Sequence, residues 1–209
     1  RMSALGFSLM DSADLASDKK KAAIVYRDGL LIAMLACRPV RRCNLAAMRI
    51  GKHLVRRGNG FLIVFESSET KTGEPFELPL PHDLCAPMTH YLDDIRLGFP
   101  AAETHDGLWA SSRGGPMSDT GLYDQVCSRT EAVFGVRVNL HQFRHNLATF
   151  VALEHPDQAV IAAGILGHRD YRSTESHYNK AGSVRAGNTH QRRLEARRKV
   201  LAAKRKKRT

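Results

Sequence analysis

Two absences in the sequence exclude broad classes of protein. The four cysteines among 209 residues form no C-x-x-C pair, so neither a disulfide framework nor a zinc ribbon is indicated, and a reducing, cytoplasmic setting fits best. No apolar run approaches the roughly 20 residues of a transmembrane helix, and no signal peptide precedes the first polar segment. We therefore expect a cytoplasmic protein that does not associate with a membrane.

The chain also begins without an initiator methionine, at Arg1, so we expect it to be part of a longer protein. Its length and its 43% hydrophobic content are enough for one substantial core with at most a small appendage. Within that size we predict three parts: an irregular linker or N-terminal extension at residues 1–21, a folded domain at 22–186 and a basic tail at 187–209.

The net charge of +11 is concentrated at the C-terminus. Residues 191–209 contain ten Lys or Arg and one acidic residue, which leaves 22 basic and 20 acidic residues in the rest of the chain. The total suggests a nucleic-acid partner, but a nearly neutral body can bind DNA only where its basic residues cluster. The tail either follows phosphates, docks on a neighbouring protomer through Leu194 and Leu201, or stays solvated.

The patterns of apolar and turn residues predict a mainly α domain with a small antiparallel β-sheet, an α+β fold. Strand-like runs at 61–66 and 75–80 flank a polar turn centred on Lys71 and indicate a β-hairpin. One further short strand is expected at 108–110. Apolar periodicity and capping residues indicate helices at 22–36, from Cys43 or Asn44, at 83–97, at 119–134 and at 157–167.

The stretch at 140–180 carries the most distinctive chemistry. His141 and Arg144 lie three residues apart, so a helix would project both from one face, and His168 and Tyr178 follow. An arginine fork matches the non-bridging oxygens of a phosphate, and a histidine can move the protons that attack on phosphorus requires. A tyrosine hydroxyl, with a pKa of about 10 when unperturbed, needs such neighbours to become a nucleophile. Together these residues can serve a phosphodiester without a metal ion or a nucleotide cofactor.

Two simpler interpretations compete with this one. His141 and His145 have the i, i+4 spacing of a zinc-binding H-E-x-x-H motif, but Gln142 occupies the position of the catalytic carboxylate and cannot accept a proton. Each residue taken singly could also be an ordinary core, cap or half-buried residue. The assignment to phosphodiester chemistry therefore depends on the combination.

Five motifs, in order, resemble those of the tyrosine recombinases, the phage integrase family, from about Tyr26 to Ala181. They are VRRCNLAAMR, ETKTGEPFELPLP, LWASSRGGPMSDTGLYDQV, LHQFRHNLATF and LGHRDYRSTESHY. A single motif such as H-x-x-R occurs by chance in many proteins, whereas the joint order and spacing are specific. The resemblance implies the catalytic-domain fold of the DNA breaking-rejoining enzymes and no cofactor.

The resemblance also implies catalytic residues at the matching positions, which are Arg41, Lys71, His141, Arg144, His168 and Tyr178. The spacing to Leu45 and Met48 favours Arg41 over Arg42, in the same motif, and over Arg38, just before it. Two positions depart from the family pattern. Asn44 stands where the family has an acidic residue, and Tyr178 lies one residue later than usual, with His177 at the common tyrosine position. Tyr178 remains the expected nucleophile, because a histidine cannot form the phosphotyrosyl bond.

The implied mechanism begins with attack of Tyr178 on a DNA phosphate, which expels a 5′-hydroxyl and leaves a 3′-phosphotyrosyl bond. Arg41 and Arg144 would bind the non-bridging oxygens, and His168 would add a hydrogen bond. The ester energy is conserved, so a second 5′-hydroxyl can rejoin the strands without a metal ion or ATP.

In the same mechanism, His141 would act as general base toward the tyrosine and Lys71 as general acid toward the leaving oxygen. The resemblance therefore implies the catalytic domain of a site-specific recombinase or integrase of a mobile element. It would act in the nucleoid on double-stranded DNA, as a homotetramer assembled on two sites. A type IB topoisomerase-like enzyme and a decayed integrase that only binds DNA remain alternatives, and the DNA target is not readable from the sequence.

Overall fold

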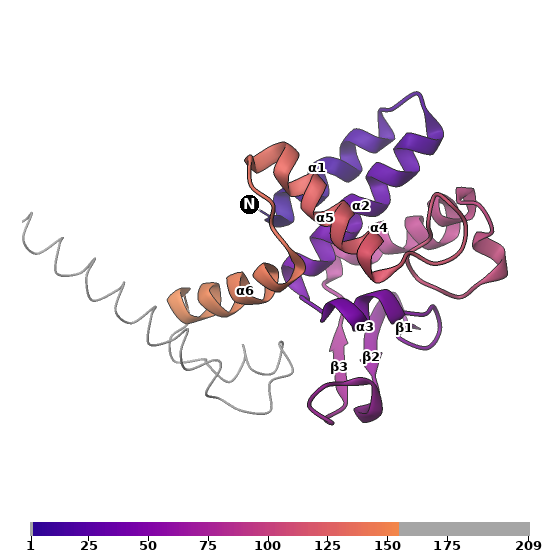
Figure 1. Cartoon of the computed structure of the whole chain (residues 1–209). Helices are drawn as coiled ribbons and strands as arrows, with labels where there is room; N and C mark the ends of the chain where they lie inside the picture. Colours follow the sequence, from indigo (N-terminus) through magenta and orange to yellow (C-terminus); the bar gives the residue numbers. More distant parts are fainter. Residues whose placement is uncertain (1, 155–209) are drawn as a thin grey trace, which may run out of the picture.

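A computed structural model of the protein describes residues 2–154. Helices pack around the long α2, and a small three-stranded sheet extends to one side beneath α3 (Figure 1). The helices are α1 (Met2–Asp14), α2 (Lys19–Cys37), α3 (Arg42–Ala47), α4 (His82–His90), α5 (Asp119–Phe134) and α6 (Leu140–Glu154). The strands are β1 (Leu54–Arg57), β2 (Gly60–Phe65) and β3 (Phe76–Pro79). The predicted mainly α fold with a small antiparallel sheet is confirmed.

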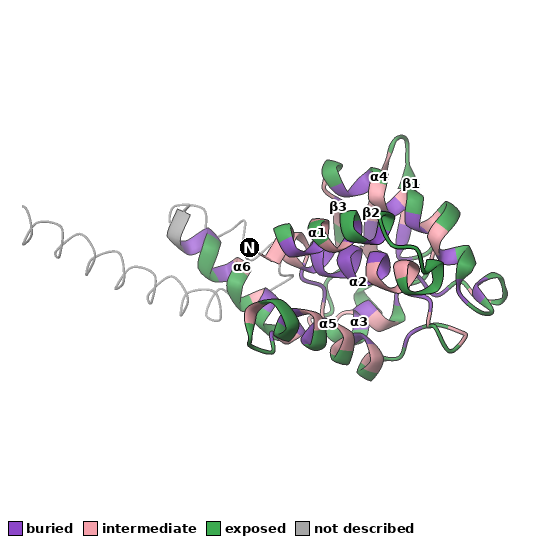
Figure 2. Cartoon of the chain, turned by 90° about the horizontal axis from the view of Figure 1, so that it is seen from above, coloured by how far each residue is buried: buried purple, intermediate pink, exposed green. Residues whose placement is uncertain are grey.

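Helix α2 forms the centre of the core. Its N-terminus is capped by Asp18, whose side chain accepts hydrogen bonds from the backbone N–H groups of Lys20 and Lys21. Every residue from Tyr26 to Leu35 is buried, and Figure 2 shows this half of α2 enclosed by the surrounding elements. The predicted buried helix at 22–36 is therefore confirmed, with slightly wider bounds.

Two charged residues of α2 lie inside this core and are paired. Arg27 Nη2 donates to Asp28 Oδ1 at 2.7 Å, and Nη1 donates to the carbonyl oxygen of Ala110 at 2.9 Å. The other oxygen of Asp28 accepts from Arg129 Nε at 2.9 Å. A buried charge without a partner would be strongly destabilising, so this network joins α2 to α5 and to the segment before α5.

The expectation of an irregular segment before residue 22 was wrong, because residues 2–14 form α1. Helix α1 packs so closely on α2 that a Cβ added to Gly29 would lie 2.6 Å from the carbonyl oxygen of Gly6. Leu5 and Met10 are buried in the same contact. Polar residues between these positions hid the helix from sequence reasoning, since its stability comes from packing on α2. The boundaries of the folded domain remain a prediction.

The predicted β-hairpin is confirmed, and a third strand precedes it. Strands β2 and β3 are antiparallel, with Phe65 opposite Phe76 and Leu62 opposite Pro79, and β1 pairs with the other edge of β2. Alternate β2 residues are buried, which matches the two-residue period of a half-buried strand. Strand β1 was not predicted, since its sequence LVRR has little alternation.

The helix predicted at 83–97 is confirmed as a continuous run, in which α4 continues into a π-turn (Tyr91–Ile95) and a 3₁₀ turn (Arg96–Gly98). The short strand predicted at 108–110 is absent from the described part of the chain, which has only isolated bridges there. The segment 102–107, just before these residues, is instead held by Arg96. The guanidinium of Arg96 donates to the carbonyl oxygens of Ala102, His105 and Gly107. These side-chain bonds replace a strand ladder.

Helix α5 begins and ends where the sequence predicted. The hydroxyl of Ser118 accepts from the backbone N–H of Gly121 at 3.1 Å, and Gly135 ends the helix with φ of +71°. The helix predicted at 157–167 and the basic tail lie outside the described residues. Within residues 2–154, none of the helices combines the length and apolarity needed to cross a lipid bilayer.

Candidate active site

A cleft of about 600 Å³ opens between the start of α3, the β2–β3 loop, α5 and the start of α6. The residues that line it are Val40, Arg41, Arg42, Lys71, Tyr123, Asn139, Leu140, His141 and Arg144. The four predicted site residues within the described part of the chain therefore meet at one cleft, although they come from three segments far apart in the sequence. His168 and Tyr178 lie outside the described residues.

Three arginines, Arg38, Arg41 and Arg42, lie in or just before the first motif, and their contacts distinguish them. Arg38 donates to the carbonyl oxygens of Pro79 and Cys37, at 3.1 and 3.0 Å. Arg42 forms an ion pair with Asp119 of α5 and lies over the ring of Tyr123, 4.9 Å from the centroid. Both guanidinium groups therefore already bind other residues of the protein.

Arg41 occupies the N-cap position of α3, with extended backbone geometry. Its guanidinium makes no hydrogen bond or ion pair with another residue that the structure describes. It lines the cleft together with Arg144. Of the three arginines, Arg41 is thus the one whose donors remain for a ligand.

Arg144 reaches the cleft from the first turns of α6 and is partly buried. Its Nη1 donates to the carbonyl oxygen of Pro39 at 2.6 Å. Burial, followed by the positive charge of Arg41, lowers the pKa of Arg144 from 12.5 to about 10. The guanidinium is still charged at neutral pH, and with Arg41 it places two positive charges on the wall of one cleft, which favours an anionic ligand.

His141 lies on the same side of α6, lines the same cleft and is exposed. Burial lowers its pKa below 6.5, and the neighbouring His145 and Arg144 lower it further. The rings of His141 and His145 meet edge to face, with centroids 4.3 Å apart. A histidine with a depressed pKa is neutral at physiological pH, so His141 can accept a proton there.

Gln142, which the zinc interpretation would need as a carboxylate, has a local role. Its side-chain oxygen accepts from the backbone N–H of Asn139 at 2.7 Å, and the side chain of Asn139 accepts from the backbone N–H of Gln142 at 3.1 Å. This reciprocal pair is a capping box that starts α6. Within residues 2–154, three or more His, Cys, Asp or Glu side chains are nowhere grouped as a metal ion would require.

Lys71 lies on the exposed β2–β3 loop at the rim of the cleft. The loop is closed by Thr70, whose hydroxyl donates to the carbonyl oxygen of Glu74 at 2.7 Å, and by Gly73 with φ of +70°. A small hollow of about 40 Å³ between the loop and α3 is lined by Thr70 and Thr72 as well as by Arg41 and Arg144. The loop that carries Lys71 therefore lines the same hollow as Arg41 and Arg144.

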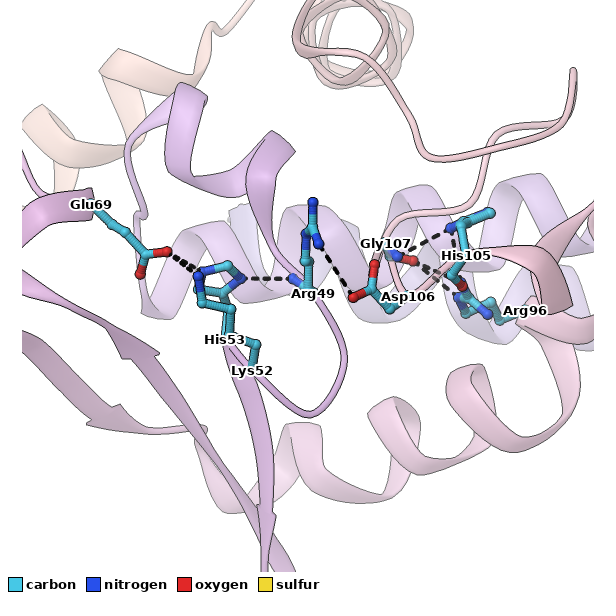
Figure 3. A network of polar contacts seen from close by, with 8 residues as sticks. All are labelled: Arg49, Lys52, His53, Glu69, Arg96, His105, Asp106 and Gly107. Atoms are coloured by element: carbon cyan, nitrogen blue, oxygen red, sulfur yellow. Dashed lines mark hydrogen bonds and ion pairs between the residues drawn. The ribbon is translucent and has the colours of Figure 1, made fainter.

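A polar network on the far side of this loop was missed by sequence reasoning (Figure 3). Nε2 of His53 lies 3.1 Å from Glu69 Oε1, and Lys52 Nζ lies 2.5 Å from the same oxygen. His53 Nδ1 accepts from the backbone N–H of Arg49 at 3.0 Å. Asn44, which stands where the family has an acidic residue, donates through Nδ2 to the carbonyl oxygen of Glu69 at 3.0 Å. Asn44 and Glu69 each lie in one of the quoted motifs, but neither motif predicts the contact between them, because it forms only in the folded chain.

Solved structures of two recombinases, XerH and XerA, have the same fold. A XerH site-specific recombinase bound to palindromic difH substrate, in a post-cleavage complex, superposes with a TM-score of 0.64 at 19% identity, over 88% of this chain and 50% of that one. The XerA recombinase gives a TM-score of 0.61 at 21% identity, over 90% of this chain and 63% of that one. The fold class defined by the helices and the small sheet is thus that of the recombinases.

The sequence comparisons then define the family. The model of the phage integrase family matches residues 9–183, so the chain belongs to the phage integrase family. Tyrosine recombinase XerD from Chlorobaculum tepidum is 29% identical over 158 residues, which cover 74% of this chain and 49% of that protein. The resemblance to tyrosine recombinases is therefore confirmed. The chain spans about half the length of this curated relative.

Proposed function

We propose that this chain is the catalytic domain of a site-specific DNA recombinase that cleaves and rejoins strands through a 3′-phosphotyrosyl intermediate. The observation that carries the proposal is the convergence of Arg41, Lys71, His141 and Arg144 on one cleft. These residues are the types that the family motifs require, and they arrive from α3, from the β2–β3 loop and from α6. The similarity to XerD and the fold of XerH and XerA support the same function.

In the proposed reaction, Tyr178 attacks the scissile phosphorus and the bond to the 5′ oxygen breaks. Arg41 and Arg144 bind the non-bridging oxygens as their negative charge grows, with a further hydrogen bond from His168. The product is a 3′-phosphotyrosyl ester and a free 5′-hydroxyl. Attack by another 5′-hydroxyl reverses the step and rejoins the strands, so neither a metal ion nor ATP enters the cycle.

Two residues handle protons in this scheme. His141 takes the hydroxyl proton of the tyrosine, a role that its lowered pKa suits, because the ring is neutral at physiological pH. Lys71 gives a proton to the departing 5′ oxygen. Its position on the loop at the cleft rim supports this assignment, since the rim is where the DNA backbone would approach.

We propose double-stranded DNA with a specific recombination site as the partner, in keeping with the difH-bound state of XerH. Recombination between two sites would involve four protomers, in the cytoplasm at the nucleoid. The basic tail at 187–209 adds sequence-independent phosphate contacts in this proposal. The target sequence would come from base contacts and DNA deformability.

The direct test is a nicked suicide duplex that traps the covalent intermediate. The wild-type chain is expected to give a protein–DNA adduct on a denaturing gel, and Tyr178→Phe is expected to bind the same DNA without forming it. An adduct that persists in the Phe variant would move the nucleophile to another residue. Absence of any adduct on DNA that the protein demonstrably binds would favour a decayed, DNA-binding protein. A single-site relaxation assay separates a type IB topoisomerase-like activity from two-site recombination.

A further inference from the structure

The loop that carries Lys71 is joined to α3 and to the segment before β1 through Glu69, two residues before the lysine. The backbone carbonyl oxygen of Glu69 accepts from Asn44, and its carboxylate contacts Lys52 and His53. The second carboxylate oxygen accepts from the backbone N–H of Glu66 at 3.0 Å, within a 3₁₀ turn (Ser67–Glu69). We call Asn44, Lys52, His53 and Glu69 the Glu69 clamp.

Asn44 connects the clamp to the arginine side of the cleft. It is buried on α3, three residues after Arg41. Its side-chain amide can donate to the carbonyl oxygen of Glu69, whereas an ionised aspartate at the same position could only accept and would repel that oxygen. The asparagine that departs from the family pattern is therefore the residue type that this contact requires.

His53 connects the clamp to the sheet. Its side chain is 5% exposed and stacks on Phe65 of β2 with ring centroids 5.0 Å apart. The backbone N–H of Arg49 can only donate, so Nδ1 accepts and the ring proton lies on Nε2, facing the carboxylate of Glu69. Figure 3 shows the resulting line from Arg49 through His53 to Glu69. The loop is thus fixed from two directions by buried side chains.

Lys71 itself makes no hydrogen bond or ion pair within the described part of the chain, and its side chain is exposed. A general acid must lie within hydrogen-bond reach of the leaving atom while the phosphate is bound. A long side chain on a free loop would spend only a small fraction of its time within reach of the leaving oxygen. A backbone that is fixed two residues away increases this fraction. The need for the clamp follows from this geometry.

We propose that Asn44 and Glu69, supported by His53, are positioning residues that place Lys71 for proton transfer to the leaving 5′ oxygen. The inference rests on the proposed function. It adds residues that act through Lys71 without touching DNA. Loss of the clamp should therefore impair only the step that needs the proton donor, leaving the arginine pair and the nucleophile in place.

The test uses the full 209-residue chain and two nicked suicide duplexes, one with the ordinary scissile 5′ oxygen and one with a bridging 5′ sulfur. A thiol has a pKa of about 8.5, so the departing thiolate needs no proton. Lys71→Ala is the reference: we expect cleavage to fall about 100-fold on the oxygen substrate and to return nearly to the wild-type rate on the sulfur substrate.

Asn44→Asp removes the donor and keeps the side-chain shape. We expect it to slow cleavage of the oxygen substrate about tenfold and to cleave the sulfur substrate at nearly the wild-type rate. Glu69→Ala, a change at the partly exposed side of the clamp, is the second variant and should give a smaller loss with the same rescue. Asn59→Asp makes the same chemical change in the exposed β1–β2 turn and should alter neither rate.

The positioning role would be overturned if Asn44→Asp and Glu69→Ala each cleaved the oxygen and the sulfur substrate more slowly by the same factor. A damaged fold or a displaced arginine pair slows both reactions. Unchanged rates in both variants would overturn it as well. A Lys71→Ala variant that sulfur does not rescue would instead remove the acid assigned in the proposed function, and the inference would fall with it. The two failures are therefore distinguishable.

Discussion

Arg144 donates through Nη1 to the backbone carbonyl oxygen of Pro39, at 2.6 Å. This bond joins α6 to the segment two residues before Arg41, so it sets the distance between the two arginines of the cleft. The same burial that makes the bond possible, together with the charge of Arg41, lowers the pKa of Arg144 to about 10. An arginine with this pKa remains charged at neutral pH.

We predict that Arg144→Lys is not a conservative change. A lysine starts from a pKa of about 10.4, and the same burial and neighbouring charge would move it toward neutral pH. The expected cleavage rate of the suicide duplex at about pH 8 is roughly 100-fold below wild type, with a smaller deficit at about pH 6, where lysine regains its proton.

The measurement is the ratio of variant to wild-type rates across that pH range. Arg137→Lys is the matched control, because Arg137 is exposed and pairs with Glu131 outside the cleft. A ratio that stays constant with pH would mean that the lysine is fully charged and that the loss comes from geometry alone.

Arg41 and Arg42 are neighbours with opposite predicted phenotypes. Arg41→Ala should reduce cleavage by about 100-fold or more with little change in unfolding midpoint, since its guanidinium holds no described residue. Arg42→Ala should mainly lower stability, because Arg42 joins α3 to α5 through Asp119 and Tyr123. Urea denaturation and suicide cleavage measured on both variants test the pair. The reverse pattern would transfer the phosphate-binding role to Arg42.

The contacts of Glu69 predict how the stability of the fold depends on pH in acid. Hydrogen bonds from Lys52, from the backbone of Glu66 and from His53 lower its pKa from 4.5 to about 2. The folded state thus binds this proton less readily than the unfolded state, so the carboxylate stabilises the fold fully above about pH 4.5 and progressively less as the pH falls toward 2. Glu69→Gln should destabilise the protein at neutral pH, and the difference should shrink in acid.

Urea unfolding at several pH values down to the acid limit of the wild type measures this difference. Glu77→Gln on β3 is the control, because the carboxylate of Glu77 has no partner in the described part of the chain. Its difference from wild type should not follow the same pH dependence. A Glu69→Gln deficit that is independent of pH would assign the loss to packing.

Local signals explain which parts of the fold were predictable. The hairpin and α5 were correct because turn glycines, alternating apolar residues and the Ser118 cap are legible in sequence. The cleft residues Arg41 and Lys71 were selected through family motifs, and the structure brings them to the same cleft. Contacts between distant segments have no such signal, so the bond from Asn44 to Glu69 could not be foreseen.

The same reasoning accounts for the errors. At 108–110 apolar residues suggested a strand, but these residues are buried under Arg96 and Tyr91, whose hydroxyl donates to the carbonyl oxygen of Leu108 at 3.0 Å. At the N-terminus, composition suggested an irregular linker, while the structure has α1 packed on α2. Both segments take their structure from partners elsewhere in the chain, and such tertiary effects override local propensity.

The contact between α1 and α2 gives the last prediction. A Cβ on Gly29 would lie 2.6 Å from the carbonyl oxygen of Gly6 and 2.9 Å from the Cβ of Leu9, so Gly29→Ala must separate the two helices. Alanine favours a helix over glycine by about 1 kcal/mol, whereas overpacking costs about 1–3 kcal/mol. We therefore expect a net loss of unfolding free energy, measured by urea denaturation. Gly98→Ala, with nothing within 4 Å of the added Cβ, should change stability by less than about 0.5 kcal/mol. A stabilised Gly29→Ala protein would show that α1 can move away from α2 without cost.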